Sequence, residues 1–260
     1  MERRTFLAQS GAAGIVSAGT ITGAEMSEAA DSRDYFELQR YTFETAAKKK
    51  IFDSFMADAA IPAMNRIGIE PIGVFYSENE FSPVYVLRRY RTLESFAESK
   101  QKLLADKAYL RDGADFLNII TETAVYSRIE SSLMVAFSAI PHLETPVHSK
   151  DRVFQLRIYE SPSVKTGLKK IEMFNTAELA IFRKTGLNPL FFGETLVGEK
   201  MPNLTYMVGF ENTKEQSESW KRFGSHPDWQ KLRAIPEYAD DRILCGITNL
   251  VLLPAPYSQI

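Results

Sequence analysis

The chain has 260 residues, of which 45% are hydrophobic and 25% are charged, as is ordinary for a globular protein. Its formal net charge is −2 and its basic residues are scattered, so we expect no nucleic-acid partner. The single cysteine, Cys245, excludes an intrachain disulfide and a thiolate metal cluster. The chain has only three histidines, and we expect no metal site and no bound cofactor.

The first 33 residues differ in composition from the rest. An arginine pair, Arg3-Arg4, precedes an uncharged stretch over residues 8–24 that is rich in Gly, Ala, Ser and Thr. This order is typical of an export signal, and the pair resembles the twin-arginine motif. The stretch is too short and too polar to predict a stable membrane span. We therefore expect residues 1–33 to be a twin-arginine-type signal with a flexible segment, and the protein to be periplasmic; the alternative is a disordered tail with a chance arginine pair.

The rest of the chain contains an internal repeat. The segment 35–41 recurs at 153–159, with Phe, Leu and Tyr at the same places, 118 positions apart. Further matches at similar spacing are Gly68 and Pro71 with Gly186 and Pro189, Tyr85 with Tyr206, Tyr109 with Trp229, and Arg128-Ile129 with Arg242-Ile243. Several such matches at nearly one spacing indicate a duplication.

Each copy predicts the same elements in the same order. A strand is followed by a long amphipathic helix, which in the first copy we expect to kink near Pro62 and to end at Gly68. Two strands, a second helix and a closing strand follow. The predicted strands are 35–41, 72–76, 84–90 and 127–137 in the first copy, and 153–159, 190–195, 204–210 and 242–253 in the second.

The order β-α-β-β-α-β predicts an α+β fold of two tandem ferredoxin-like units. We place the first unit at 34–141, a linker at 142–151 and the second unit at 152–260. Each unit carries helices on one sheet face, so the other face must be buried. Two sheets packed together would bury it, either within one chain or between two chains, and we favour a homodimer.

The repeat resembles the NIPSNAP family, a branch of the dimeric α+β barrel superfamily. The opening Leu156-Arg157-Ile158-Tyr159 is similar to the family's Leu-Arg-x-Tyr, and the two Gly-x-x-Pro turns also fit. In the second copy, Trp220-x-x-Phe223 and the run from His226 to Trp229 fit as well. The first copy departs from the pattern, because Gln39 replaces the arginine and no His-Pro follows its second helix.

The resemblance implies the fold better than the activity. Together with the export signal, it suggests an exported protein of uncharacterised role that binds a small molecule or acts as a scaffold through its barrel. Fold-level relatives include cofactor-free monooxygenases and haem-binding barrels, so the alternative is a cofactor-independent monooxygenase or isomerase acting in the cavity between the sheets. A haem-binding barrel is a weaker third hypothesis. The sequence offers no complete catalytic constellation and no nucleotide-binding or nucleophile-elbow motif, so whether the chain is an enzyme stays open.

Alternation along the first strand of each copy suggests where a ligand would lie. We expect Phe154, Leu156 and Ile158 to face the helices, and the residues between them to face the space between the sheets. The candidate ligand-binding residues are Gln155, Arg157, Tyr159, Glu37, Gln39 and Tyr41. The catalytic candidates are Arg157, Tyr159 and His226, as an anion-binding group and proton-transfer groups. Alternatively, the strand residues only join the two sheets and His226 only holds its loop.

Overall fold

The computed structural model describes residues 32–78 and 80–260. The arginine pair and the uncharged stretch of the expected export signal lie outside these residues. Among the helices of the described part, none is long and apolar enough to cross a membrane. Residues 33–260 form one compact unit.

The first half of this unit contains four strands, with two groups of helices between them. In chain order its elements are β1 (Tyr35–Thr42), α1 (Ala46–Phe55), η1 (Met56–Ala60), α2 (Ile61–Arg66), β2 (Gly73–Ser77), β3 (Val84–Tyr90), α3 (Leu93–Ala105), α4 (Lys107–Asp112), α5 (Ala114–Leu117), η2 (Thr121–Thr123) and β4 (Arg128–Ala136).

The second half repeats this order. Its elements are β5 (Val153–Glu160), α6 (Val164–Met173), η3 (Phe174–Glu178), α7 (Leu179–Thr185), β6 (Asn188–Val197), β7 (Asn203–Phe210), α8 (Thr213–Ser225), α9 (Pro227–Arg233), η4 (Pro236–Tyr238), α10 (Asp240–Ile243) and β8 (Gly246–Pro254). No helix or strand forms between β4 and β5, where the linker is predicted.

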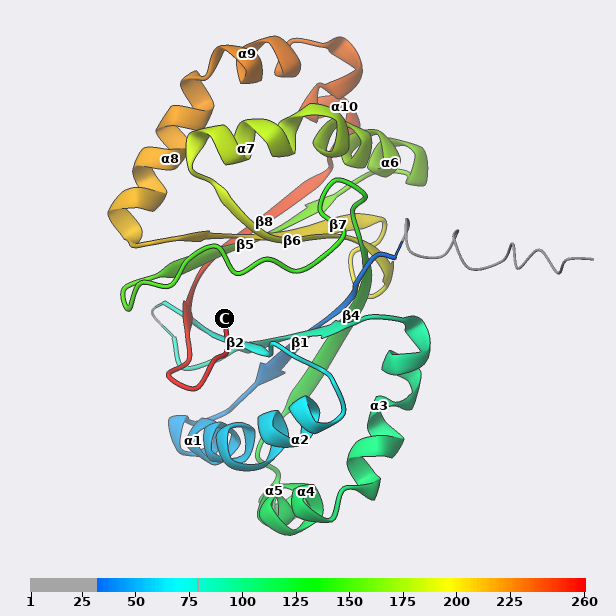
Figure 1. Ribbon diagram of the computed structural model, residues 1–260, viewed down its shortest axis with the longest axis vertical. Coiled ribbons are helices and arrows are strands. Elements are labelled where there is room, and N and C mark those ends of the chain that lie inside the picture. Colours follow the sequence, from blue (N-terminus) through cyan, green and yellow to red (C-terminus); the bar gives the residue numbers. More distant parts are fainter. Residues whose placement is uncertain (1–31, 79) are drawn as a thin grey trace, which may run out of the picture. The chain divides into compact units, whose positions relative to one another are not determined.

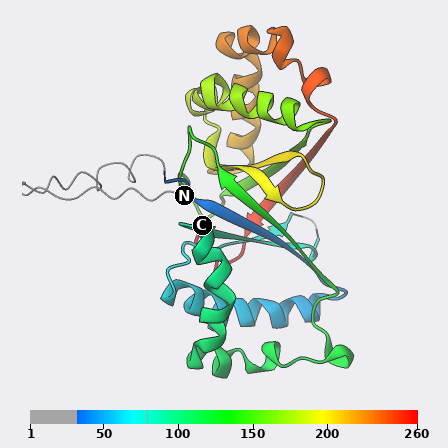
Figure 2. The ribbon, with the colours of Figure 1, turned by 90° about the vertical axis from the view of Figure 1, so that its right-hand side faces the viewer.

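The eight strands form one closed barrel in the order β1-β3-β2-β8-β5-β7-β6-β4. Each half contributes four antiparallel strands in the ferredoxin-like order, and the pairs β2–β8 and β4–β6 join the two sheets. The helices of the two halves cover opposite outer sides of the barrel (Figures 1 and 2). The predicted α+β fold is confirmed, and of the two arrangements left open the barrel closes within one chain. The homodimer stays a prediction.

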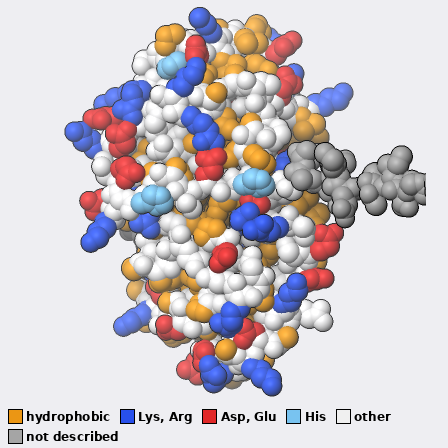
Figure 3. All heavy atoms as spheres, in the orientation of Figure 1, with side chains coloured by type: hydrophobic (Ala, Val, Ile, Leu, Met, Phe, Trp, Pro, Cys, Tyr) orange, Lys and Arg blue, Asp and Glu red, His pale blue; other side chains and the backbone are white. Residues whose placement is uncertain are grey.

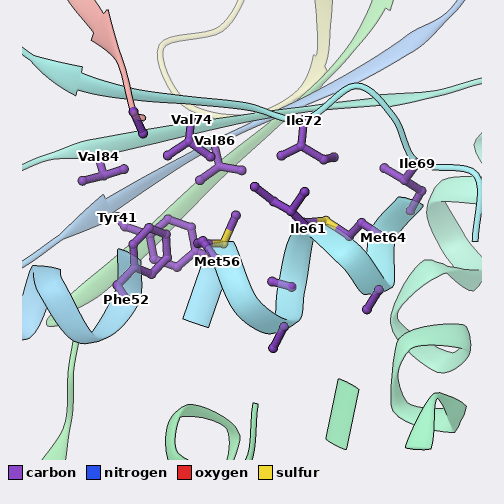
Figure 4. Close-up of a cluster of buried hydrophobic side chains, with 14 of the residues drawn as sticks. Tyr41, Phe52, Met56, Ile61, Met64, Ile69, Ile72, Val74, Val84 and Val86 are labelled. Atoms are coloured by element: carbon purple, nitrogen blue, oxygen red, sulfur yellow. The ribbon is translucent and has the colours of Figure 1, made fainter. Parts of the chain in front are cut away.

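Three clusters of buried side chains hold these layers together. One fills the barrel itself and includes Phe36, Leu38, Phe154 and Leu156. The other two lie between the outer sheet faces and the helices, one in each half. Figure 4 shows the cluster of the first half, where strand side chains such as Val84 and Val86 meet the first helices. On the face shown in Figure 3, acidic and basic side chains are interspersed.

The long first helix of each half contains a π-helical turn. Met56–Ala60 in the first half and Phe174–Glu178 in the second lie at matching positions, 118 residues apart. The kink expected at Pro62 is therefore better described as this π turn, which precedes the proline. Since the second half has the same turn without a proline there, Pro62 is not its cause. Gly68 and Gly186 follow the helices with φ of 79° and 83°, as a glycine stop predicts.

Strand pairing corrects two of the repeat matches. Arg40 pairs with Tyr85, whereas the equivalent Ile158 pairs with Thr205, so the counterpart of Tyr85 is Thr205 rather than Tyr206. A shift of one residue reverses the face of a strand residue. Tyr85 accordingly lies in the barrel cluster and Tyr206 under the helices. The match of Arg128 with Arg242 was also wrong, because Arg242 belongs to α10 and β8 begins only at Gly246.

Candidate functional site

The first strand of each half faces the opposite way from our expectation. Phe154 and Leu156 point into the barrel, while Gln155 and Tyr159 lie beneath the helices. The physical reason is that closure of the barrel buries the middle of its interior, which is filled by apolar side chains of the strands. The face beneath the helices carries the polar and aromatic residues, and any site that uses them lies between sheet and helices.

In the first half this polar face forms a hydrogen-bonded group around Glu37. The carboxylate of Glu37 accepts from Gln39 Nε2 at 2.8 Å, Tyr90 Oη at 2.9 Å and Ser131 Oγ at 2.9 Å. Tyr41 Oη in turn donates to Gln39 Oε1 at 2.9 Å. Glu37 is only 6% exposed, and these donors stabilise its carboxylate, which would otherwise be costly to bury.

Arg88 on β3 completes the group. Its Nη1 lies 3.3 Å from Glu37 Oε2, and its side chain is 17% exposed. Burial lowers the pKa of Arg88, but Glu37, Tyr41 and Tyr90 more than offset this, so the guanidinium stays charged. Among the described residues, Arg88 Nε is buried without a hydrogen-bond partner. Arg152 Nε and Arg157 Nε are likewise buried without a partner, so this atom does not distinguish Arg88 from them.

A pocket with a volume of ≈ 470 Å³ lies next to this group. A separate pocket of ≈ 380 Å³ lies at one end of the barrel. The sheet side of the first of these pockets is formed by Glu37, Gln39, Tyr41 and Arg88. Its other walls are formed by α3, α4 and α5, with apolar side chains such as Phe96, Leu103 and Leu117 together with Lys100. The helix α3 has no fully buried residue, so it covers the sheet loosely. An apolar cavity with a few polar groups at one side is the usual form of a small-molecule site.

The equivalent space in the second half is filled. The helices α3 and α8 both have 13 residues and begin 120 positions apart, which makes Trp220 the counterpart of Lys100. The Trp220 indole donates to Gln155 Oε1 and lies 4.9 Å from the Arg157 guanidinium. Unlike α3, the helix α8 has fully buried residues, among them Phe223. The large side chain of Trp220 thus fills, in the second half, the space that is an open pocket in the first half.

The three catalytic candidates from the sequence are not brought together in one pocket. Arg157 packs between the rings of Tyr159 and Trp220, and Tyr159 Oη is hydrogen-bonded to Tyr206 Oη at 3.0 Å. Burial raises the pKa of Tyr159. His226 is the N-cap of α9, where its Nδ1 accepts from the Asp228 backbone N–H at 3.2 Å.

Three of the candidates from the sequence, Glu37, Gln39 and Tyr41, line this pocket, although they were expected between the sheets; Arg88, which also lines it, was not a candidate. The sequence offers one signal for Arg88. It follows Val84 and Val86 at alternate positions of β3, so its charged side chain lies on the same face as theirs, beneath the helices. Nothing local distinguishes it from the neighbouring Arg89, which pairs with Asp34 instead. Within the described residues there is no group of three or more His, Cys, Asp or Glu side chains that could hold a metal ion.

Comparison with known proteins supports the fold and part of the family assignment. Residues 154–259, which lie in the second half, match the NIPSNAP family model. No curated protein sequence matches the chain.

Solved structures match across both halves. A "putative monooxygenase" from Lactobacillus acidophilus has a TM-score of 0.59 and 11% identity, covering 85% of this chain and 94% of its own. A second "putative monooxygenase", from Fusobacterium nucleatum, has a TM-score of 0.57 and 9% identity, covering 86% and 93%. An anthrone oxidase-like protein has a TM-score of 0.51 and 9% identity, covering 87% and 93%. At these identities the similarity establishes the fold alone.

Proposed function

We propose that the chain is a NIPSNAP-type protein that binds a small molecule in the pocket beneath α3. The observation that carries this proposal is the open pocket of ≈ 470 Å³ beside the buried Glu37–Arg88 pair, where the equivalent space of the second half is closed by Trp220. A fold that needed this space only for stability would gain from filling it, as its own second half does.

The pocket walls indicate the class of ligand. Phe96, Leu103 and Leu117 favour an aromatic or aliphatic body. The charged side chains of Arg88 and Lys100 favour an acceptor oxygen at the end near the sheet or at the entrance. The ligand we propose is therefore a small, mainly apolar molecule with a carbonyl, phenolate or carboxylate oxygen.

A cofactor-independent monooxygenase or isomerase is the second candidate. It is supported by the names of the two structurally similar proteins and by the presence of a carboxylate, a guanidinium and a tyrosine at one side of the pocket. Such chemistry would run beneath α3 rather than between the sheets. Glu37 would be the proton-transfer group and Arg88 would stabilise a developing enolate.

Export and dimer formation are part of the same proposal. The arginine pair and the uncharged stretch behind it support a twin-arginine route to the periplasm. The route carries folded proteins, which is compatible with a ligand bound before export. The closed barrel removes the need for a partner chain to bury the inner sheet faces, so a homodimer would use the outer surface.

The test is to close the pocket with the residue that closes the second half. We expect the wild-type protein to enhance the fluorescence of anilinonaphthalene sulfonate, an aromatic anion, and Lys100→Trp to reduce that enhancement strongly. Lys102→Trp is the matched control, because it places the same ring on α3 at an exposed position that does not line the pocket. Equal enhancement by the two variants would contradict the proposal. Native mass spectrometry of the purified protein, with and without Lys100→Trp, would identify a co-purifying ligand.

A further inference from the structure

The barrel has a second pocket at one of its ends, separate from the pocket beneath α3. It has a volume of ≈ 380 Å³ and is lined by inward-facing residues of β1, β3, β4, β5, β7 and β8. Its floor is the packed barrel cluster, to which Leu38 and Leu250 belong. Val147 of the linker and the C-terminal Ile260 also belong to that cluster, so the interior is filled beyond the floor and the pocket is blind.

The walls of this pocket differ between the two halves at matching positions. Strand pairing gives the matches: Arg40 with Ile158, Glu130 with Thr248, Ser132 with Leu250, and Tyr85 with Thr205. At these four positions the first half therefore supplies an ion pair and two hydroxyl groups, and the second half supplies two apolar side chains and two threonines without charge. A duplication places the same residues on both walls at first. The difference at these four positions therefore arose after the duplication.

Two opposite charges stand side by side on the wall supplied by the first half. Arg40 and Glu130 form an ion pair, with side chains 42% and 24% exposed, so both are within reach of solvent and of a ligand. The Arg40–Glu130 bond uses one of the five N–H donors of the guanidinium. Burial raises the pKa of the neighbouring Tyr85, which keeps its hydroxyl protonated as a further donor.

Lys200 reaches over the other side of the opening. It lies in the turn between β6 and β7 with φ of 56°, a conformation that residues other than glycine seldom adopt. Its Nζ donates to Thr248 Oγ1 at 3.2 Å and lies 3.4 Å from Glu160 Oε1. Unfavourable backbone conformations persist where the surroundings require them, and they are concentrated at binding sites.

We propose that this end of the barrel binds a small zwitterion with an apolar side chain, in the chemical class of apolar amino acids and dipeptides. Arg40 would take the carboxylate, Glu130 the ammonium group, and Ile158 and Leu250 the apolar side chain. The lining contains two basic and two acidic side chains, Arg40, Lys200, Glu130 and Glu199, so a ligand without net charge leaves the pocket balanced. The pocket is large enough for a dipeptide, and it needs no contribution from the site beneath α3.

The test is calorimetric titration with leucyl-leucine and with its capped form, N-acetyl-leucyl-leucinamide. We expect leucyl-leucine to bind, and the capped form to bind at least about tenfold more weakly because it lacks both charges. Arg40→Gln and Glu130→Gln should each weaken leucyl-leucine binding by about tenfold or more. Arg91→Gln, a change at an exposed position, should leave it unchanged.

The outcomes separate this site from the other one. Lys100→Trp, which fills the pocket beneath α3, should not alter leucyl-leucine binding. Absence of binding to the wild-type protein, equal binding of the capped form, or wild-type affinity in both Arg40→Gln and Glu130→Gln would each overturn the proposal. Circular dichroism of the variants would check that they fold, as the solvent exposure of both side chains predicts.

Discussion

The two halves of the barrel bury an ion pair in different places. In the first half, Glu37 on β1 and Arg88 on β3 lie beneath α3, beside the open pocket. In the second half, Lys170 on α6 and Glu178 on η3 belong to the first long helix itself, and their charged atoms lie 3.2 Å apart. At the matching positions the partner half is neutral: Gln155 and Val208 replace the first pair, and Phe52 and Ala60 replace the second.

The surroundings of the two pairs suggest different roles. The side chains of Lys170 and Glu178 are 2% and 3% exposed, and the rings of Tyr159, Phe174 and Trp229 surround the ammonium. This pair is enclosed by the protein itself, as expected of a structural pair. Arg88 and Glu37 line a cavity, as expected of a binding pair. The two halves therefore differ in what surrounds their buried ion pair: protein side chains in the second half and an open pocket in the first.

The largest effect should come from breaking the enclosed pair. Lys170→Phe leaves Glu178 buried without its counter-ion, and the free energy of unfolding at neutral pH should fall by about 3–5 kcal/mol. The double variant Lys170→Phe/Glu178→Ala should recover most of this loss, because it installs the residues that the first half carries at these positions. Urea unfolding of both variants measures the effect. A double variant no more stable than the single one would show that the halves are not interchangeable here.

The same single variant should acquire a dependence on pH. Burial raises the pKa of Glu178 above its usual 4.5, and loss of Lys170 removes the main group that opposes this rise. The folded variant then holds a proton that the unfolded chain releases above pH 4.5, so its stability falls as pH rises. The deficit relative to wild type should therefore be smaller at pH 4.5 than at pH 7.5, and equal deficits at both would contradict the buried-charge explanation.

A smaller effect should come from the binding pair. Tyr90→Phe removes the hydrogen bond to Glu37 and makes β3 like β7, where Phe210 is the counterpart. At neutral pH we expect a loss of about 1.5 kcal/mol in the free energy of unfolding. Burial raises the pKa of Tyr90 to about 12, whereas an exposed tyrosine titrates near 10. Between these pH values the unfolded wild type releases the proton and the folded one keeps it, so the wild type loses stability there and the variant does not.

The stability difference between wild type and Tyr90→Phe should therefore shrink as pH rises from 10 towards 12. Urea unfolding at pH 8 and at several values above 10 measures it. Leu93→Ala, a change at a 41% exposed site on α3, is a control whose difference from wild type should stay constant over this range. A constant difference for Tyr90→Phe would mean that its hydroxyl titrates normally.

Much of the fold could be predicted because the duplication repeats its own signals. The two first strands, the glycine stops and the strand β3 were placed within a residue or two, since each copy supports the other. The face of the first strand could not be predicted. Both faces of the sheet are buried, one by the helices and the other by the barrel interior. Apolar residues such as Phe36 and Leu38 suit either face.

The site was predicted only in part, for a related reason. Glu37, Gln39 and Tyr41 were chosen as candidates because polar residues that alternate with apolar ones in a buried strand require an explanation. Arg88 and Lys100 were missed because their role depends on how far α3 stands from the sheet. That distance follows from side chains on several elements, among them Phe96, Tyr109 and Leu117, and no local pattern records it.

The smallest effect compares the two glycines that end the first helices. Both have positive φ, so an added methyl group strains the backbone in either half, by about 1 kcal/mol. At Gly68 a Cβ would meet nothing within 4 Å, whereas at Gly186 it would lie 2.7 Å from Arg222 Nη2 and 3.0 Å from Ser219 Oγ. Arg222 Nε also donates to the Thr185 carbonyl at 3.0 Å, so displacing it exposes the end of α7. Gly186→Ala should therefore lower the free energy of unfolding more than Gly68→Ala, by about another 1 kcal/mol. Equal losses in urea unfolding would mean that Arg222 moves aside without cost, and that the closer packing of α8 in the second half is less rigid than its contacts indicate.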